Sequence, residues 1–169
     1  MFLILLLMFL ALFTATEEQA GAPAPTTPTP TPPVGEQARV LRVIDGDTIE
    51  VSLNRRNRRV RYIGINTPER DEPCSNAATA ANRRLVGGRD VTLVRGAEET
   101  DRYGRLLRYI YADGVFVNEA LVREGFAENF VWEPNTRFVD RFRALEAEAQ
   151  SAGRGCHPSG VFDDGDTER

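Results

Sequence analysis

Two charged side chains of this sequence fall in rows of apolar residues, where a strand with one buried face would not normally carry them. Asp47 shares the strand parity of Ile49 and Val51, so alternation directs its carboxylate to the apolar side of the sheet. Arg61 shares its parity with Ile63 in the same way. Both positions also have a structural explanation, because Asp47 can accept hydrogen bonds in a turn and Arg61 can form an ion pair with it.

Further polar side chains lie in tight turns beside predicted strands. Pro68 stiffens the turn in "INTPER" and fixes the directions of Asn66, Thr67 and Glu69. Arg105 follows a glycine at the start of another strand. With the two residues above, this set offers oxygen ligands for a hard cation, a carboxylate that can act on water, and two guanidiniums for phosphate. Such a set could bring a cation, a water molecule and a phosphate together.

Other hydrolytic designs lack their parts in this sequence. His157 is the only histidine, so a mechanism that needs two histidines is excluded, and we expect this residue at the surface. One histidine and two distant cysteines do not form a zinc ligand set. The net charge of the chain is -4, but the segment between Arg39 and Gly160 is weakly basic, which permits a ligand that carries phosphate.

The elements that must hold these residues are mainly strands. The predicted strands are residues 38–44, 48–54, 58–65, 90–96 and 105–114. The first three form an antiparallel meander with turns at an Asp-Gly pair and at the polar loop "RRNRR". A helix capped by Ser75 or Asn76 and stopped by two glycines separates the third strand from the fourth. We therefore predict an α+β, mainly β domain: a five-stranded OB-fold barrel with three helices.

The other two helices follow the barrel. "VNEALVREGF" predicts a short helix with Asn118 as its cap and Gly125 as its stop. The segment 135–153 is the clearest helix, because apolar residues recur along one face at a spacing of three or four. These apolar residues are Phe138, Phe142, Leu145 and Ala149.

The ends of the chain differ from the domain in composition. Residues 1–20 contain an apolar run that is too short to span a bilayer, and we expect them to be a signal peptide or an N-terminal membrane anchor of a secreted or extracytoplasmic protein. Residues 21–37 are rich in proline and threonine and should form an extended linker. The expected domain is 38–158, followed by an acidic, disordered tail over 159–169.

The two cysteines lie near the first helix and after the last one. In an exported chain an even number of cysteines favours a disulfide, here between Cys74 and Cys156. The alternative is two unrelated buried thiols.

Several motifs occur in order along the chain, namely "IDGDT", "VRYIGINTPE", "DRYGR" followed by "YIYADG", and "VNEALVREG". Over roughly residues 38–155 the sequence resembles staphylococcal nuclease and its thermonuclease relatives. The resemblance implies an OB-fold barrel with added helices, which agrees with the layout above. It also implies a Ca²⁺-dependent nuclease of low sequence specificity that cleaves DNA and RNA and leaves 3′-phosphate ends. We expect it to act as a monomer.

The resemblance assigns the metal-side residues. Asp47 corresponds to a direct calcium ligand, and Thr67 to a residue whose main-chain carbonyl binds the ion. Asp45 belongs to the turn and to the outer shell of the metal. Asn66 replaces a second calcium carboxylate of the reference enzymes, so it keeps an oxygen donor but loses a charge, and calcium affinity should fall.

The resemblance also assigns the catalytic residues. Glu69 corresponds to the proposed general base, which either takes a proton from water or orients it. Arg61 and Arg105 correspond to the pair that holds phosphate, and Tyr103 to an aromatic residue beside the nucleotide or in packing. The alternatives are an OB-fold module that binds nucleic acid without cutting it, or a structural domain tethered to an envelope. A binder would need positive charge but not the acidic residues.

Overall fold

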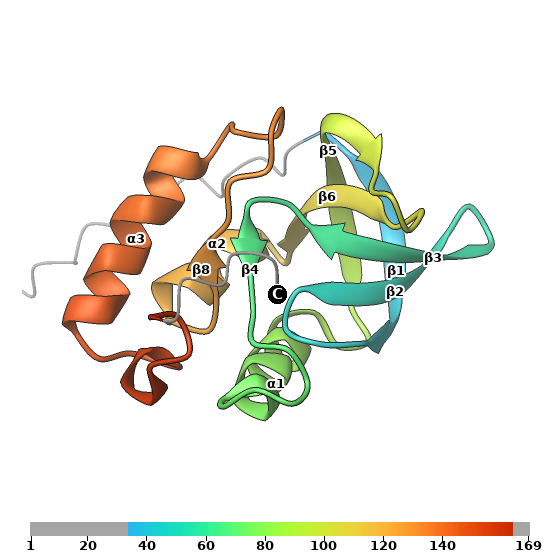
Figure 1. Ribbon diagram of the computed structural model, residues 1–169. Coiled ribbons are helices and arrows are strands. Elements are labelled where there is room, and N and C mark those ends of the chain that lie inside the picture. Colours follow the sequence, from blue (N-terminus) through green and yellow to red (C-terminus); the bar gives the residue numbers. More distant parts are fainter. Residues whose placement is uncertain (1–33, 164–169) are drawn as a thin grey trace, which may run out of the picture.

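The computed structural model describes residues 34–163, and five strands of this part close into a barrel (Figure 1). The barrel strands are β1 (Glu36–Val43), β2 (Thr48–Leu53), β3 (Arg56–Tyr62), β5 (Asp90–Thr100) and β6 (Leu106–Ala112). Their order is β3-β2-β1-β5-β6, and a parallel pairing of β3 with β6 joins the two ends of the sheet. The two-residue strand β7 (Val115–Phe116) extends the sheet beyond β6. The prediction of a mainly β, five-stranded OB-fold barrel is confirmed.

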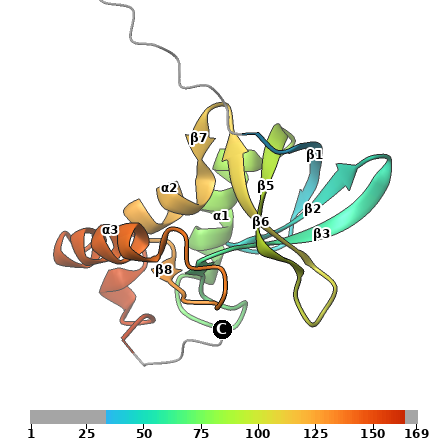
Figure 2. The same cartoon turned by 90° about the horizontal axis from the view of Figure 1, so that it is seen from above.

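Three helices lie outside the barrel, as predicted (Figures 1 and 2). They are α1 (Ser75–Val86), α2 (Val117–Arg123) and α3 (Val139–Ser151). Figure 1 shows α2 and α3 together on one side, while the hairpin of β2 and β3 projects from the other. A second, two-stranded sheet pairs β4 (Ile65–Asn66) with β8 (Glu128–Asn129), next to α3.

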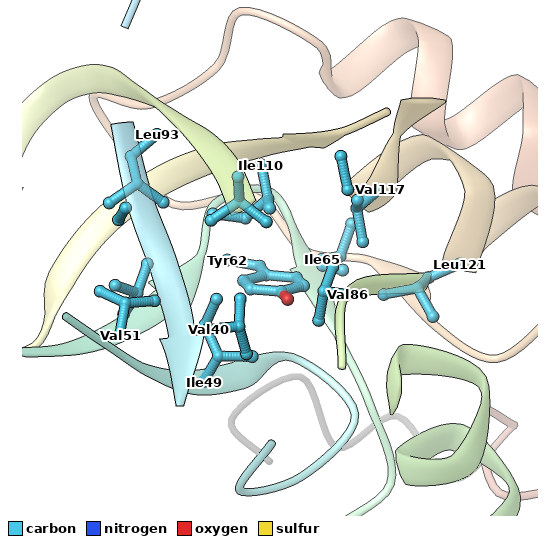
Figure 3. Close-up of a cluster of buried hydrophobic side chains, with 14 of the residues drawn as sticks. Val40, Ile49, Val51, Tyr62, Ile65, Val86, Leu93, Ile110, Val117 and Leu121 are labelled. Atoms are coloured by element: carbon cyan, nitrogen blue, oxygen red, sulfur yellow. The ribbon is translucent and has the colours of Figure 1, made fainter. Parts of the chain in front are cut away.

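The core fills the barrel and continues under the helices (Figure 3). In β2 the alternation predicted from sequence is observed, because Ile49, Val51 and Leu53 are buried while the residues between them are only half-buried. Tyr62 lies among these side chains, and its hydroxyl donates a hydrogen bond to Oδ1 of Asn82 in α1 over 2.9 Å. The one polar group of this ring is therefore satisfied inside the core.

The turn between β1 and β2 is longer than the two-residue Asp-Gly hairpin that the sequence predicts. Ile44 donates its backbone N–H to the carbonyl of Thr48 over 3.0 Å, which leaves residues 45–47 as a loop. Oδ1 of Asp45 accepts the N–H of Asp47 over 3.1 Å, a side-chain turn typical of aspartate.

The tight two-residue turn lies instead between β2 and β3. Asn54 and Arg55 have φ angles of 51° and 63°, and Leu53 pairs directly with Arg56. Positive φ at both central residues matches the twist of the strands. The predicted polar loop "RRNRR" is wrong, because four of its five residues belong to β3.

Three predicted helix starts are also wrong. The cap of α1 is Cys74 rather than Ser75 or Asn76, which both lie inside the helix. Asn118 is not a cap but lies inside α2, fully buried, where Oδ1 accepts the N–H of Ile110 and Nδ2 donates to the carbonyl of Ile63, both over 2.9 Å. Helix α3 begins at Val139 rather than near 135. Asn135 is held elsewhere, since its Oδ1 accepts the N–H of Ala97 in β5 over 2.7 Å.

A disulfide fastens the C-terminal segment to the start of α1. Cys74 and Cys156 are joined by an S–S bond of 2.11 Å across 82 positions of sequence. Cys156 packs with Ala78 and with the buried Val161, so the beginning of the expected tail 159–169 packs on the domain. A 3-10 helix, η1 (His157–Ser159), lies between them.

The expected signal or anchor, and all but the last four residues of the expected linker, lie outside residues 34–163. Within that described range, no helix is both long and apolar enough to cross a membrane.

Candidate active site

The buried carboxylate of Asp47 binds its neighbours mainly through one of its two oxygens. Asp47 lies directly before β2 and is only 5% exposed. Its Oδ2 accepts the backbone N–H and the hydroxyl of Thr67, each over 3.0 Å, and lies 3.0 Å from Nη1 of Arg61. Its Oδ1 accepts only the hydroxyl of Thr48, over 3.1 Å, so this oxygen retains the capacity for another partner. The unexpected position of Asp47 is thus explained by a site that surrounds it.

Gly46 permits this arrangement. A Cβ at Gly46 would lie 2.5 Å from Oγ1 of Thr67, which is closer than real contacts allow. The loop before β2 and the turn after β4 therefore meet only because residue 46 has no side chain.

Arg61 faces inward from β3 and binds the same turn. Nη1 donates to the carbonyls of Tyr62 and Ile65 over 3.0 and 2.8 Å, and Nη2 donates to Oδ1 of Asn66 over 2.9 Å. Within the described part of the chain, its Nε has no acceptor. Hydrogen bonds from Nη1 and Nη2 therefore hold Arg61 in place, and its Nε–H remains available to donate to a ligand.

Asn66 lies behind Arg61 rather than in the pocket wall. It is 1% exposed, and its Nδ2 donates to Oε1 of the buried Glu128 over 3.2 Å. The partners fix the orientation of the amide, because its oxygen faces a guanidinium and its nitrogen faces a carboxylate. Both ends of the side chain are thus engaged by protein groups.

The predicted catalytic residues converge on one pocket of about 260 Å³. Its lining residues are Asp45, Asp47, Thr48, Arg61, Glu69, Arg102, Tyr103, Arg105, Phe130 and Trp132. Thr67 and Asn66 lie behind this wall, and the disulfide is not part of it. Glu69 is exposed on its rim, where its backbone N–H donates to Oε2 of Glu72 over 2.7 Å.

Arg105 is positioned by Asp101, a residue that the sequence reasoning did not single out. Oδ2 of Asp101 accepts from Nε of Arg105 over 2.6 Å, and its Oδ1 accepts the backbone N–H groups of Tyr103 and Arg105, each over 2.9 Å. Because Asp101 holds Nε, the two terminal nitrogens of the guanidinium are left to face the pocket. The aspartate in "DRYGR" was the available sequence signal, since aspartate often organises a turn through its own backbone neighbours.

A hydrogen bond from α1 holds the backbone of Asp45. Nδ2 of Asn82 donates to the carbonyl of Asp45 over 2.9 Å, while its Oδ1 binds Tyr62. Burial raises the pKa of the Asp45 carboxyl to about 6, and the nearby charge of Asp47 acts in the same direction. Two neighbouring acidic groups in a partly dry site are the arrangement that a cation would relieve.

Two aromatic residues of the pocket wall also escaped the sequence analysis. Phe130 and Trp132 follow β8, and their ring centroids are 5.9 Å apart. Nε1 of Trp132 donates to Oε2 of Glu98 over 3.2 Å, which fixes the indole. Phe130 and Trp132 in "NFVWEP" are two positions apart, as on one face of an extended segment, but two residues are too few to establish a strand pattern. These rings give the pocket an apolar wall opposite its charges.

The donors around Asp47 fit a hard cation with an incomplete protein shell. Asp45, Asp47 and Glu69 supply only oxygen atoms to the pocket, as calcium prefers. Among residues 34–163, however, no three acidic, histidine or cysteine side chains gather into a metal-binding group. An ion here would therefore need main-chain oxygen, water or substrate oxygen to complete the six to eight ligands that are usual for calcium.

Comparison with known proteins gives the same picture. The family model described as "Staphylococcal nuclease homologue" matches residues 59–156. The chain is 42% identical over 118 residues to endonuclease YncB of Bacillus subtilis (strain 168), which covers 65% of this chain and 56% of the relative. It is 34% identical over 118 residues to a thermonuclease of Staphylococcus hyicus, covering 66% of this chain and 70% of the relative. An uncharacterized endonuclease of Escherichia coli O157:H7 is 41% identical over 119 residues, covering 69% of this chain and 74% of the relative.

Proposed function

Because the chain belongs to the family of staphylococcal nuclease homologues, we propose that its pocket hydrolyses phosphodiester bonds of nucleic acid as an endonuclease. The observation that carries the proposal is the convergence of Asp47, Arg61, Glu69 and Arg105 on one pocket. The relatives with similar sequences are named endonuclease and thermonuclease. The matched region is little more than half of the Bacillus relative, so the proposal concerns the domain.

The side chains divide the chemistry between them. Arg61 and Arg105 approach the pocket from β3 and from the turn before β6, so they can bind the phosphate and stabilise the charge that develops on it. Glu69 on the rim can orient a water molecule or take its proton. Asp101 positions Arg105, and the aromatic wall can hold a base or sugar. Attack of water on phosphorus, with departure of the 5′-oxygen, would leave a 3′-phosphate.

We also propose that calcium is the cofactor and that both DNA and RNA are substrates. Asp47 would hold the ion, with the main-chain carbonyl of Thr67 and with Asp45 in the outer shell. When bound, calcium would supply positive charge to the phosphate and to the attacking water. The proposal of calcium rests on the carboxylate oxygens of Asp45, Asp47 and Glu69 in the pocket and on the family to which the chain belongs.

A non-catalytic nucleic-acid-binding module remains the second candidate. It is favoured by one observation, the engagement of Asn66 by Arg61 and Glu128, which removes a potential metal ligand from the pocket wall. A binder, however, would gain nothing from carboxylates directed toward a phosphate path.

End-group analysis tests the proposed chemistry. The full chain is incubated with 5′-labelled DNA and RNA strands in ¹⁸O-water, with calcium or with a chelator. We expect cleavage only with calcium, and one ¹⁸O atom in each new 3′-phosphate from both substrates. A 2′,3′-cyclic phosphate from RNA alone would contradict water attack, and binding without cleavage would favour the second candidate.

Export through residues 1–20 is a separate proposal. It is supported by the apolar run and by the disulfide between Cys74 and Cys156, since disulfides persist mainly in oxidising compartments. Fractionation of cells that produce the full chain, or a chain without residues 1–20, should place only the full chain outside the cytoplasm. Equal distribution of the two proteins would contradict export.

A further inference from the structure

A second pocket lies beside the candidate active site and shares two of its residues. This hairpin pocket, of about 380 Å³, is lined by Asn57, Arg58, Arg59, Tyr103, Gly104 and Arg105. Tyr103 and Arg105 also line the candidate active site, so the two pockets are adjacent. Gly104 lies between these two residues, and the other three lining residues come from the projecting end of β3 (Figure 1).

The end of the hairpin that forms one wall of this pocket carries four arginines, of which Arg58 and Arg59 line the pocket. Arg55, Arg56, Arg58 and Arg59, which we call the arginine hairpin, are all exposed, and none has a carboxylate partner among the described residues. Glu50 lies opposite Arg59 in the β2–β3 register, but it is already bonded to Arg42 over 3.0 Å and to Asn57 over 3.3 Å. Exposed charge of one sign along a groove attracts a ligand of the other sign.

The spacing along β3 fits a chain of phosphates. Alternation places Arg59 and Asn57 on the same face of the strand as Arg61, which lines the active-site pocket. Successive residues of one face are about 6.6–6.8 Å apart in a strand. Arg61 and Arg59 thus place two guanidiniums at this interval, from the candidate active site toward the tip of the hairpin, while the amide of Asn57 beyond them is bonded to Glu50.

Tyr103 indicates which form of nucleic acid is bound. Its ring is 67% exposed, and the guanidinium carbons of Arg102 and Arg105 lie 4.9 and 5.4 Å from its centroid, which holds the ring in place. An exposed aromatic face beside a basic groove can stack on an unpaired base, whereas the bases of a duplex are already stacked.

From these observations we propose that the arginine hairpin and the hairpin pocket bind the backbone of a single nucleic-acid strand, on phosphates that flank the one cleaved. The proposal rests on the proposed function, because it extends the same substrate beyond the active-site pocket. In this proposal the arginines of β3 raise the affinity for longer strands, whereas the residues of the candidate active site carry out the cleavage.

The test compares two double variants of equal charge in the full chain. Arg58→Gln/Arg59→Gln changes the hairpin pocket, and Arg83→Gln/Arg143→Gln removes two exposed arginines from α1 and α3 that line neither pocket. Binding of a fluorescent single-stranded ten-nucleotide DNA is measured by anisotropy in chelator, over a range of salt concentrations. Because no cleavage is needed, failure of the proposed function does not obscure the result.

We expect the hairpin variant to bind about tenfold more weakly and to lower the slope of log affinity against log salt by about 1.4, as loss of two phosphate contacts predicts. The control variant should keep the wild-type slope. Arg59→Gln alone should lower the slope by about 0.7, which covers the case in which the double variant does not fold. A ten-base-pair duplex is measured in the same way. Equal slopes for the hairpin and control variants, or a loss of affinity confined to the duplex, would overturn the proposal even if the wild type cleaves.

Discussion

The side-chain amide of Asn66 bridges Arg61 and Glu128: its Oδ1 accepts from Nη2 of Arg61 over 2.9 Å, and its Nδ2 donates to Oε1 of Glu128 over 3.2 Å. An aspartate at this position would place one carboxylate against another in a buried site. The asparagine thus fits its surroundings, because its amide nitrogen donates to Glu128 while its oxygen accepts from Arg61.

We predict that Asn66→Asp lowers the free energy of unfolding by about 1–3 kcal/mol, since the buried carboxylate of Glu128 loses the hydrogen bond from residue 66 and gains a like charge beside it. Glu128→Gln in the same chain should recover most of this loss. Urea unfolding of both single variants and the double variant measures the coupling. Additive effects would show that the two side chains do not interact.

In the background of Glu128→Gln, we predict that Asn66→Asp lowers the calcium concentration for half-maximal cleavage, because it adds negative charge near the ion. The fluorescence of Trp132, the only tryptophan, gives a second readout of calcium binding. An unchanged midpoint in both measurements would show that the charge at residue 66 does not act on the metal.

Arg105→Ala should lower the turnover number by about two to three orders of magnitude, as expected for loss of a charge-stabilising donor. Asp101→Asn should lower it less, because it removes the charge that aligns Arg105 but keeps an oxygen acceptor. Steady-state cleavage kinetics measure both effects, with circular dichroism as the check on folding. Folded variants with wild-type turnover would remove Arg105 from the catalytic set.

Loss of the Cys74–Cys156 disulfide should lower the free energy of unfolding by about 2–5 kcal/mol, because it closes a long loop in the unfolded chain. Peptide mapping without reduction checks the bond itself, and urea unfolding of Cys74→Ala/Cys156→Ala checks its contribution. Two free thiols in the full chain, purified without reductant, would contradict the pairing.

His157 should titrate below its ordinary pKa of 6.5, because burial disfavours the charged ring and the nearby Asp163 only partly offsets this. As the pH falls, His157 is therefore protonated in the unfolded chain before it is protonated in the folded chain. The contribution of neutral His157 to the free energy of unfolding is complete above pH 6.5 and is lost as the pH falls through the lower pKa of the folded state. Proton NMR is direct, since the chain has a single histidine. A pKa at or above 6.5 would contradict the packing of Phe162 against the ring at 5.2 Å.

Local patterns predicted the fold well where one physical rule dominates. Alternation in β2 and the apolar face of α3 gave the correct elements, because burial on one side decides both. Local patterns gave the wrong result at Asn118, which was predicted as a helix cap, and at the arginines of β3, which were predicted as a loop. Asn118 has the sequence position of a cap, but its amide donates to the carbonyl of Ile63, 55 positions away. The arginines after Arg55 lie in β3 because the turn at Asn54 and Arg55 is only two residues long.

The candidate site was predictable where residues belong to compact motifs. Asp47, Arg61, Glu69 and Arg105 were found in this way and meet in one pocket. Trp132 was not found, because it follows β8 in a segment without periodicity. The partner of Asn66 was also hidden, since Glu128 lies 62 positions away and only the pairing of β4 with β8 brings them together.

The most direct measurement of nuclease chemistry at this pocket is the initial rate of cleavage of a 5′-labelled single-stranded DNA by the wild type, Glu69→Gln and Asp71→Asn, with calcium and with a chelator. Asp71 is a matched control, because it is an exposed acidic residue two positions away that does not line the pocket. We predict calcium-dependent cleavage by the wild type and by Asp71→Asn, and a rate lower by about two to four orders of magnitude for Glu69→Gln. Cleavage by a folded Glu69→Gln protein at the wild-type rate, or equal wild-type rates with calcium and with chelator, would contradict this assignment.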